Sequence, residues 1–481
     1  TVVTYAYRST APGAMPDDTG GFTQFTAAQI AATELALSAW AAVANITFVR
    51  ANDGGGYSNN ASILFGNYAT GAEGAAAFAY TPIFGSTAAN DVEGDVWINS
   101  SLSYNANPLI GEYGQQVLMH EIGHALGLSH PGDYNAAPGV TIEYGTHAVY
   151  FDDSRMFTMM SYFASASTGA TLGAFASLPQ LHDIAAIQRL YGANLGTRTG
   201  DSTYGFNSNV SVTEYQILSS AQAAVFTIWD GGGVDTLDLS GYSTASTIDL
   251  RQEAYSSAGP ASAGLAVFNI AIARGVVIEN AIGGAGADHL IGNDANNQLN
   301  GGAGADAMEG GNGNDSYFVD SSGDVVTEAS PTGGVDTVNS SITNYQLTSN
   351  VENLTLNSPA MNGSGNSSNN LIVGNAADNN LYGLDGNDFL QGAGGSDRLD
   401  GGAGDDFLIG GAGQDLLLGG PGADEASFGN ELRRSYSFDA NTVTLTPIQG
   451  YLGDSASSVE SLAFFDGMLV VDAGSEAAQV F

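Results

Sequence analysis

A nine-residue repeat in the C-terminal half of the chain constrains its fold more than any other feature. Segments GGAGADHLI, GNDANNQLN, GGAGADAME and GGNGNDSYF begin at residues 283, 292, 301 and 310. An interruption follows at 319–364, and the same register then runs from 365 to the segment that begins at 419. One such segment cannot bury the apolar residue at its eighth position alone. Successive turns must therefore stack into a parallel β-roll with a thin core.

The repeat also carries the oxygen donors of a calcium site. Its glycines permit a tight turn with inward-facing carbonyl groups, and the residue at position six adds a carboxylate. Calcium takes six to eight oxygen ligands, which two neighbouring turns supply together. The ligands that this pattern predicts are Gly284, Gly286, Asp288, Gly301, Ala303, Asp306, Gly310, Asn312, Asp315, Asp388, Asp397, Asp406, Asp415 and Asp424.

Position six is asparagine rather than aspartate in three of the eleven turns, at Asn297, Asn370 and Asn379. We expect calcium to bind weakly or not at all at these turns. A glycine-rich disordered linker is the alternative interpretation, but such a linker does not keep an apolar residue at position eight of each nine-residue turn. Without calcium we do expect disorder, because the stacked carboxylates repel one another and each turn buries little apolar area.

The charge of the chain agrees with cation binding. The formal net charge is −40, from 50 acidic residues against 10 basic ones, all of which are arginine. Such a chain does not bind nucleic acid or an anionic membrane through its charge. Either the acidic residues are solvated, as in a halophilic or partly disordered chain, or they hold cations, and the repeat favours cations. The chain contains no cysteine for a disulfide and no run of 18 apolar residues for a membrane anchor.

A second motif, HEIGHALGLSH at 120–130, predicts a zinc site. His120 and His124 lie four residues apart, so a helix places both imidazoles on one face. Gly127 allows the chain to leave the helix with a positive φ, and His130 returns as the third ligand. Three imidazoles leave one zinc position open for water, and Glu121 stands beside them to act on that water. The alternative is a helix whose surface histidines happen to have this spacing.

The first 195 residues show the pattern of an α/β domain. Thr26 and Gln29 form a capping box in front of an alanine-rich helix that extends to Val43. We predict further helices at 113–126 and 181–191. The predicted strands are 46–50, 61–68, 75–80 and 95–99. The remaining histidines, His147, His182 and His289, are assigned structural or surface roles.

Together the zinc motif and the repeat resemble the serralysin family, which consists of secreted zinc endopeptidases of the metzincin clan. The likeness covers roughly residues 1–320 and includes MFTMMSYF at 156–163, which is similar to the Met-turn of the family. Segment 182–209, HDIAAIQRLYGANLGTRTGDSTYGFNSN, is similar as well. The resemblance implies an α+β metzincin-like zinc protease domain followed by an all-β parallel β-roll that binds calcium. The interrupted repeat divides the roll of this chain into two blocks.

The resemblance also implies roles for individual residues. Met160 lies beneath the metal, and Tyr162 both ligates zinc and stabilises the oxyanion. Glu121 is the general base, and residues 75–80 form the edge strand that binds an extended peptide. Further calcium ligands are implied at Arg198, Gly200, Ser202, Asp230, Gly232, Gly233, Asp235 and Glu279.

These observations predict five regions. They are a zinc metalloprotease domain at 1–195, a first calcium-binding β-roll or β-sandwich at 196–325, connecting strands at 326–364, a second calcium-binding β-roll at 365–428 and a strand-rich cap at 429–481. The second roll departs from the usual pattern of the family. The final EAAQVF fits the secretion signal of the family poorly.

The predicted function is broad-specificity hydrolysis of protein substrates by a secreted, monomeric enzyme. We expect one catalytic zinc ion and about seven to nine structural calcium ions. The resemblance implies a small protein inhibitor and a type I secretion apparatus as partners. Two alternatives stay open: a calcium-dependent binding or adhesion protein with a degenerate zinc domain, and a zinc hydrolase of another substrate class.

Overall fold

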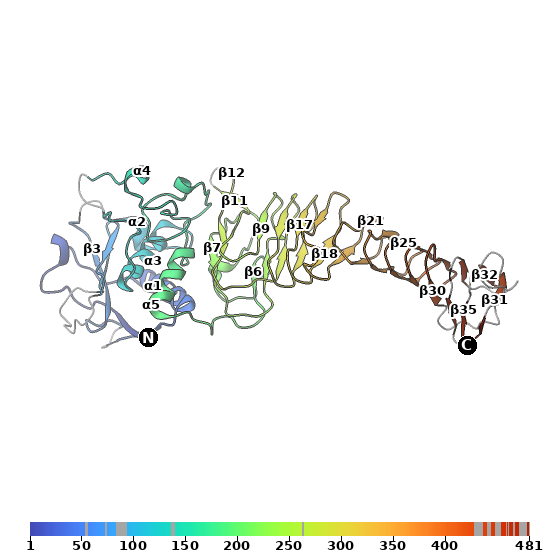
Figure 1. Ribbon diagram of the computed structural model, residues 1–481. Helices are drawn as coiled ribbons and strands as arrows, with labels where there is room; N and C mark the ends of the chain where they lie inside the picture. Colours follow the sequence, from blue (N-terminus) through green and yellow to red (C-terminus); the bar gives the residue numbers. More distant parts are fainter. Residues whose placement is uncertain are drawn as a thin grey trace. The chain divides into compact units, whose positions relative to one another are not determined.

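The computed structural model describes two compact units, Thr1–Ile278 and Glu279–Phe481. We call them unit 1 and unit 2 and describe each separately (Figure 1). Described are all residues except 53–55, 73–74, 83–93, 136–139, 262–263, 428–435, 440–443, 448–453, 458, 460, 465–466, 471–478 and 481. The predicted cap at 429–481 therefore lies largely outside the described residues. Within the described part, no helix is long and apolar enough to cross a membrane.

A five-stranded sheet with the strand order β2-β1-β3-β5-β4 opens unit 1. The strands are β1 (Val2–Tyr7), β2 (Thr47–Arg50), β3 (Ile63–Tyr68), β4 (Ala77–Ala79) and β5 (Val96–Asn99). Central β3 is buried along its whole length. Edge strand β4 alone among these five runs antiparallel to its neighbour. The four strands predicted from the sequence are therefore confirmed, with slightly shorter bounds.

Five α-helices complete the first part of unit 1. They are α1 (Ala27–Val43), α2 (Ser103–Ala106), α3 (Tyr113–Ala125), α4 (Tyr144–His147) and α5 (Leu181–Tyr191), with short 3₁₀ helices at η1 (Pro16–Asp18), η2 (Ser165–Thr168) and η3 (Thr213–Tyr215). The capping box is confirmed, because the Gln29 amide donates to Thr26 Oγ1 and the Thr26 amide donates to Gln29 Oε1. Helix α3 lies beside α1 on one side of the sheet (Figure 1).

Short strands make up the rest of unit 1. They are β6 (Thr203–Gly205), β7 (Phe226–Ile228), β8 (Thr236–Asp238), β9 (Thr247–Asp249), β10 (Tyr255–Ser256), β11 (Pro260–Ala261), β12 (Gly264–Leu265) and β13 (Ile270–Ile272). Strand β6 pairs in parallel with β8, and β7 with β13. The buried rings of Tyr204, Tyr215 and Phe226 contact one another edge to face and form a local core.

Unit 2 is a ladder of short strands that pair in parallel through the repeats and partly antiparallel near its end. Its strands are β14 (Asn280–Ile282), β15 (His289–Ile291), β16 (Gln298–Asn300), β17 (Ala307–Glu309), β18 (Ser316–Val319), β19 (Val325–Thr327), β20 (Thr337–Ser340), β21 (Asn344–Gln346), β22 (Asn353–Leu356), β23 (Asn362–Ser364), β24 (Leu371–Val373), β25 (Asn380–Asp385), β26 (Phe389–Gly394), β27 (Arg398–Ala403), β28 (Phe407–Ala412), β29 (Leu416–Leu418), β30 (Glu425–Ser427), β31 (Tyr436–Asp439), β32 (Thr444–Pro447), β33 (Ser455–Ser457), β34 (Ser461–Phe464), β35 (Gly467–Val470) and β36 (Gln479–Val480).

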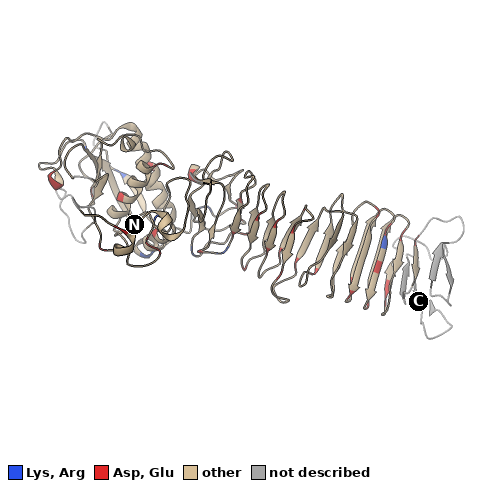
Figure 2. Ribbon diagram, turned by 90° about the horizontal axis from the view of Figure 1, so that it is seen from above, with Lys and Arg blue, Asp and Glu red and all other residues tan. Residues whose placement is uncertain are grey.

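The pairing in unit 2 follows the repeat. Through the repeats, each strand pairs in parallel with the strand two repeats onward, so Leu290 lies beside Met308 and Leu299 beside Tyr317. Near the end of the unit, β31, β32, β35 and β36 pair antiparallel instead. These residues at position eight are fully buried, as the thin core of a β-roll requires. Strands between 326 and 364 join the same ladder, because β20 pairs with β18 and with β22. Acidic residues recur at the turns of unit 2 (Figure 2).

Candidate metal centre and calcium sites

Three histidine side chains converge in unit 1. The Nε2 atoms of His120 and His124 lie 3.1 Å apart, those of His124 and His130 3.0 Å, and those of His120 and His130 3.2 Å. Two nitrogens that bind one tetrahedral zinc at about 2.0–2.1 Å lie about 3.4 Å apart. The nitrogen triangle is slightly tighter than that, and its three lone pairs point at one position. The donor set therefore fits a zinc ion.

The other nitrogen of each ring determines which tautomer is present. Every Nδ1 lies within hydrogen-bond distance of a backbone carbonyl, which only accepts, so Nδ1 carries the proton and Nε2 keeps its lone pair. The carbonyls are those of Met159 for His120 at 2.7 Å, Leu128 for His124 at 2.8 Å and Tyr134 for His130 at 2.8 Å. Burial lowers the pKa of His124 to about 4 and that of His120 well below 6.5. The rings are therefore neutral at pH 7, as metal ligands must be.

The backbone delivers His130 as the motif predicts. Helix α3 carries His120 and His124, and Gly127 follows its end with φ of +98°, which confirms the expected left-handed turn. At Gly123, between the two helical ligands, an added Cβ would lie 2.6 Å from Met160 Sδ and 3.4 Å from the Trp40 ring. The Met-turn sulfur therefore packs directly on the metal-site helix, and no larger residue fits there.

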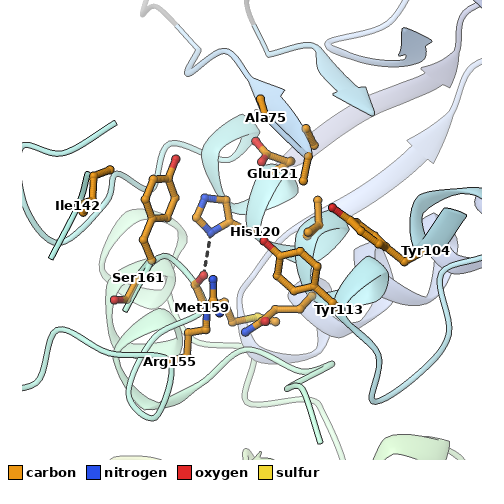
Figure 3. A pocket seen from close by; sticks show the side chains of 14 residues that line it. Ala75, Tyr104, Tyr113, His120, Glu121, Ile142, Arg155, Met159 and Ser161 are labelled. Atoms are coloured by element: carbon orange, nitrogen blue, oxygen red, sulfur yellow. Dashed lines mark hydrogen bonds between the residues drawn. The ribbon is translucent and has the colours of Figure 1, made fainter. Parts of the chain in front are cut away.

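Glu121 is buried beside His120 (Figure 3). Burial raises the pKa of its carboxyl group to about 8. A neighbouring dication favours the ionised form and lowers that pKa again. Glu121 is therefore largely protonated at pH 7 without a metal, and a metal in the site would favour its carboxylate form.

A cavity of about 380 Å³ opens beside Glu121 and His120. Ala75, Ala76 and Ala77 of the edge-strand region form one wall, as expected from the sequence. Its other lining residues are Tyr104, Tyr113, Gln116, Val117, Ile142, Arg155, Met159, Ser161 and Tyr162. The Arg155 guanidinium stacks over the Tyr113 ring, and no carboxylate of the described residues forms an ion pair with it. Sequence reasoning missed Arg155, because nothing in its local pattern marks it.

Tyr162 lies against the ligand rings. Its ring centroid is 4.4 Å from that of His130 and 5.8 Å from that of His120. Tyr134 also stacks on the His130 ring, with 11° between the two ring planes. Its hydroxyl donates a hydrogen bond to buried Asp153. The predicted zinc-site residues are thus all within one aromatic cluster.

Asp183 forms hydrogen bonds with residues of the Met-turn. This fully buried carboxylate accepts hydrogen bonds from Thr158 Oγ1 at 2.6 Å, from the Met159 amide at 2.8 Å and from the Gln180 amide at 2.9 Å. Met159 in turn offers its carbonyl to His120. Asp183 therefore orients a zinc-ligand ring through one peptide unit.

We expect Asp183→Asn to weaken zinc binding by about 10- to 100-fold, because an amide cannot accept all three hydrogen bonds that orient this peptide unit. Zinc affinity, measured by competition with a chelating dye, checks this. Asp133→Asn is the matched control, since Asp133 is exposed beside the motif. Equal affinities in the two variants would contradict the orienting role.

Two loops of unit 1 contain the calcium ligands that the resemblance implies, except Glu279, which is the first residue of unit 2. The Ser202 amide donates to Asp235 Oδ1 at 2.7 Å, and the Gly232 amide donates to Asp230 Oδ1 at 2.7 Å. A Cβ on Gly233, whose φ is +149°, would lie 2.6 Å from the Gly200 carbonyl carbon. The structure therefore brings 198–202 and 230–235 together. The Arg198 guanidinium donates to the Trp229 carbonyl and to Tyr204 Oη.

Within unit 2, the position-six carboxylates point inward. One oxygen of each accepts a hydrogen bond from the backbone amide 18 residues earlier, as Asp388 Oδ1 does from Asn370. The second oxygen is buried without a hydrogen-bond partner in Asp306, Asp315, Asp388, Asp397, Asp406 and Asp415. That second oxygen lies against the first glycine of its own turn, since a Cβ on Gly301 would be 2.3 Å from Asp306 Oδ2. Buried unpaired carboxylate oxygens require either a bound cation or protonation, and the repeat pattern favours a cation.

The remaining predicted repeat positions supply backbone groups. A Cβ on Gly302 would be 2.3 Å from the Gly284 carbonyl oxygen, so this carbonyl faces the turn one rung onward. A Cβ on Gly304 would be 2.0 Å from the Gly286 carbonyl oxygen. The Asn312 side chain donates through Nδ2 to exposed Asp294.

In the turns with asparagine at position six, the side-chain amide forms hydrogen bonds with the protein itself. Asn297 Oδ1 accepts from the Asn293 amide, and its Nδ2 donates to the Glu279 carbonyl at 3.0 Å. Asn379 Nδ2 likewise donates to the Met361 carbonyl at 3.2 Å. The side-chain amide thus takes the hydrogen bonds that an aspartate turn leaves open, which supports the expectation of weak calcium sites there.

A pH prediction follows from the buried carboxylates. Burial raises the pKa of Asp315 and Asp388 to about 7 and that of Asp306 to about 6, from an ordinary value of 3.8. Without calcium the folded state therefore binds protons more tightly than the unfolded state, so its stability is highest below pH 4 and falls as pH rises towards 7. Circular dichroism of the calcium-free chain between pH 4 and 8 checks this. Excess calcium, the control, should abolish that fall, whereas a calcium-free chain that gains β signal with pH would contradict the prediction.

Comparison with known proteins agrees with these sites. Residues 22–157 match the Matrixin family, and residues 193–332 match the family described as Peptidase M10 serralysin C terminal. Residues 364–399 and 391–426 match the RTX calcium-binding nonapeptide repeat. A matrixin domain implies zinc, and RTX repeats imply calcium.

Curated relatives extend the comparison. The chain is 44% identical over 306 residues to Metallopeptidase AprA of Pseudomonas marginalis, covering 62% of this chain and 61% of the relative. It is 44% identical over 305 residues to Serralysin G of Dickeya chrysanthemi, covering 62% and 60%. With Serralysin C of the same species it shares 47% identity over 280 residues, covering 57% and 56%. The match thus spans about 60% of the length of the first two relatives.

The fold and the comparisons together define the class: a region similar to the Matrixin family, followed by a parallel β-roll whose sequence matches RTX calcium-binding repeats. This confirms the predicted fold class. Over the matched residues the chain is a relative of the serralysins, so the resemblance noted from the sequence is confirmed as well.

Proposed function

We propose that this protein is a secreted, calcium-stabilised zinc endopeptidase that cleaves proteins with broad specificity. One observation carries the proposal: three neutral imidazoles converge on one position beside a buried glutamate, at the wall of a cavity next to a sheet edge. The names of the relatives support it, since they describe a metallopeptidase and serralysins.

His120, His124 and His130 would hold the zinc ion. Bound there, zinc supplies a Lewis acid that lowers the pKa of water to about 7 and polarises a carbonyl group. Glu121 takes the proton of the attacking water and passes it to the leaving amine. Tyr162, whose ring lies against His130, donates a hydrogen bond from its hydroxyl group to the oxyanion.

The extended substrate would add as a further strand beside β4. Main-chain hydrogen bonds recognise any sequence, so broad tolerance follows. The cavity beyond Glu121 receives one substrate side chain, and Arg155 gives it a polar, cationic wall. The substrate class is therefore extended polypeptide, with recognition that depends mainly on its backbone.

Calcium would hold unit 2 folded, with about seven to nine ions between its turns and in the two loops of unit 1. Secretion, a type I export apparatus, a small protein inhibitor and a monomeric state are further parts of the proposal. They rest on the resemblance to the serralysins alone.

Casein cleavage with and without 1,10-phenanthroline tests the proposed activity. We expect cleavage that phenanthroline abolishes and added zinc restores, with calcium kept in excess throughout. A calcium-dependent binding protein with a degenerate zinc domain would cleave nothing under either condition. A hydrolase of another class would spare casein but hydrolyse an ester or a sugar in a phenanthroline-sensitive way. Either result would overturn the proposal.

A further inference from the structure

The register of unit 2 changes where the nine-residue repeat is interrupted. In regular turns, the backbone amide of position six donates to the position-six side chain 18 residues later, as Asn297 does to Asp315. Across the interruption the spacing is 21 residues from Asp315 to Asp336 and 16 from Asp336 to Glu352. It returns to 18 residues from Asn370 to Asp388. The ladder therefore continues through the interruption with carboxylates that the repeat pattern does not predict.

A third carboxylate enters the ladder at this point. Asp315, Glu328 and Asp336 each place one carboxylate oxygen within 4.8 Å of the others. The exposed fractions of the three residues are 1%, 5% and 1%. Glu328 follows β19 inside the interruption, so it belongs to no repeat. Three carboxyl groups thus share one buried space.

Two oxygens in this space have no protein partner. Asp315 Oδ1 accepts from the Asn297 amide, but Asp315 Oδ2 is buried without a hydrogen bond. Glu328 Oε1 accepts from the Tyr317 hydroxyl, but Glu328 Oε2 is likewise buried and unsatisfied. In the described part of the chain, no basic side chain forms an ion pair with any of the three carboxylates. A buried cluster of this charge is costly, and either a bound cation or protonation of the carboxyl groups offsets that cost.

Neighbouring glycines leave the room that a cation needs. A Cβ on Gly310 would lie 2.2 Å from Asp315 Oδ2 and 2.6 Å from Glu328 Oε1. A Cβ on Gly333 would lie 2.9 Å from the Gly311 carbonyl oxygen and 3.9 Å from Glu328 Oε2. The Tyr317 hydroxyl lies there too, 2.1 Å from that Cβ position on Gly310, so two carboxylates, a hydroxyl and a backbone carbonyl face one space.

We propose that Asp315, Glu328 and Asp336 bind one calcium ion at the point where the nine-residue register breaks. All of the donors are oxygen, which selects a hard cation, and the irregular set of carboxylates and carbonyls suits calcium rather than octahedral magnesium. The site lies outside the repeat consensus in two of its three ligands. It joins the last turn of the first repeat block to the loop that leads to the next rung, so it keeps the roll in register through the interruption.

Calcium titration of the full-length chain tests this site. Glu328→Gln is expected to bind one calcium ion fewer per chain than the natural sequence, as counted by equilibrium dialysis with mass-spectrometric metal analysis. Glu309→Gln is the matched control, because Glu309 is an exposed residue of the same unit and pairs only with His289 in the described structure. A full calcium complement with unchanged affinity in Glu328→Gln would overturn the proposal.

Glu328→Asp keeps the test decisive if Glu328→Gln fails to fold. The shorter side chain retains the charge but withdraws the oxygen from the metal. We therefore expect full occupancy in excess calcium, with about tenfold weaker binding at one site, equivalent to about 1.4 kcal/mol. A titration identical to that of the natural sequence would reject the site. These readouts do not involve proteolysis, so they stand apart from the proposed enzymatic function.

Discussion

Replacement of Glu121 by alanine is expected to reduce peptide hydrolysis by at least about 10³-fold while the purified chain keeps one zinc ion. The three imidazoles would hold the metal without Glu121, so we expect the zinc content not to depend on this side chain. Burial raises the pKa of Glu121 to about 8, which means that folding gains nothing from its charge. The variant should therefore be at least as stable as the natural sequence.

The measurements are kcat/KM with a fluorogenic peptide, zinc content by metal analysis and the midpoint of thermal unfolding. Glu112→Ala provides the control, because Glu112 is exposed at the start of α3 and makes no capping hydrogen bond. It should keep full activity. Substantial proteolysis by Glu121→Ala would remove Glu121 from the role of general base, and loss of zinc would instead assign it to the metal.

Removal of calcium by EGTA at pH 7 is expected to unfold unit 2 while the helices of unit 1 persist. At this pH most buried position-six carboxylates would ionise without a counterion, and their mutual repulsion opposes stacking of the turns. Each turn contributes little apolar area, because its core residue at position eight is a single side chain such as Leu390 or Leu408. Metal binding and folding of this unit are therefore one process.

Circular dichroism and limited proteolysis check this prediction. The β signal should fall, and cleavage sites should appear within 279–427 before they appear in unit 1. Restoring calcium should restore both observables, whereas adding magnesium at the same concentration serves as the control and should not. An unchanged β signal and an uncleaved unit 2 after calcium removal would refute coupled folding.

Two residues of the candidate site could not be assigned a role from the sequence, for the same physical reason. Asp183 lies 63 residues from His120, and Arg155 35 residues from it. Only folding brings the Met-turn between Asp183 and the zinc ligand, and only the cavity shows that Arg155 lines it. A buried acid at the start of a helix has an ordinary explanation as a cap, so its pattern alone carries no signal of this role.

Local pattern was enough for the features that depend on short stretches of chain. Four features each follow from the local pattern of one element. They are the histidine spacing on α3, the left-handed Gly127, the capping box of α1 and the nine-residue repeats of unit 2. Such features are encoded by neighbours in the sequence, because helix and turn geometry repeats over a few residues.

Tertiary structure decided what depends on distant neighbours. It placed the Met159 carbonyl on His120, brought loop 198–202 against 230–235 and carried Asp336 and Glu328 to Asp315 across an irregular spacing. No sequence periodicity links these positions. They are in contact because a buried ionic or polar group needs a partner, and the folded chain supplies that partner from a distant segment.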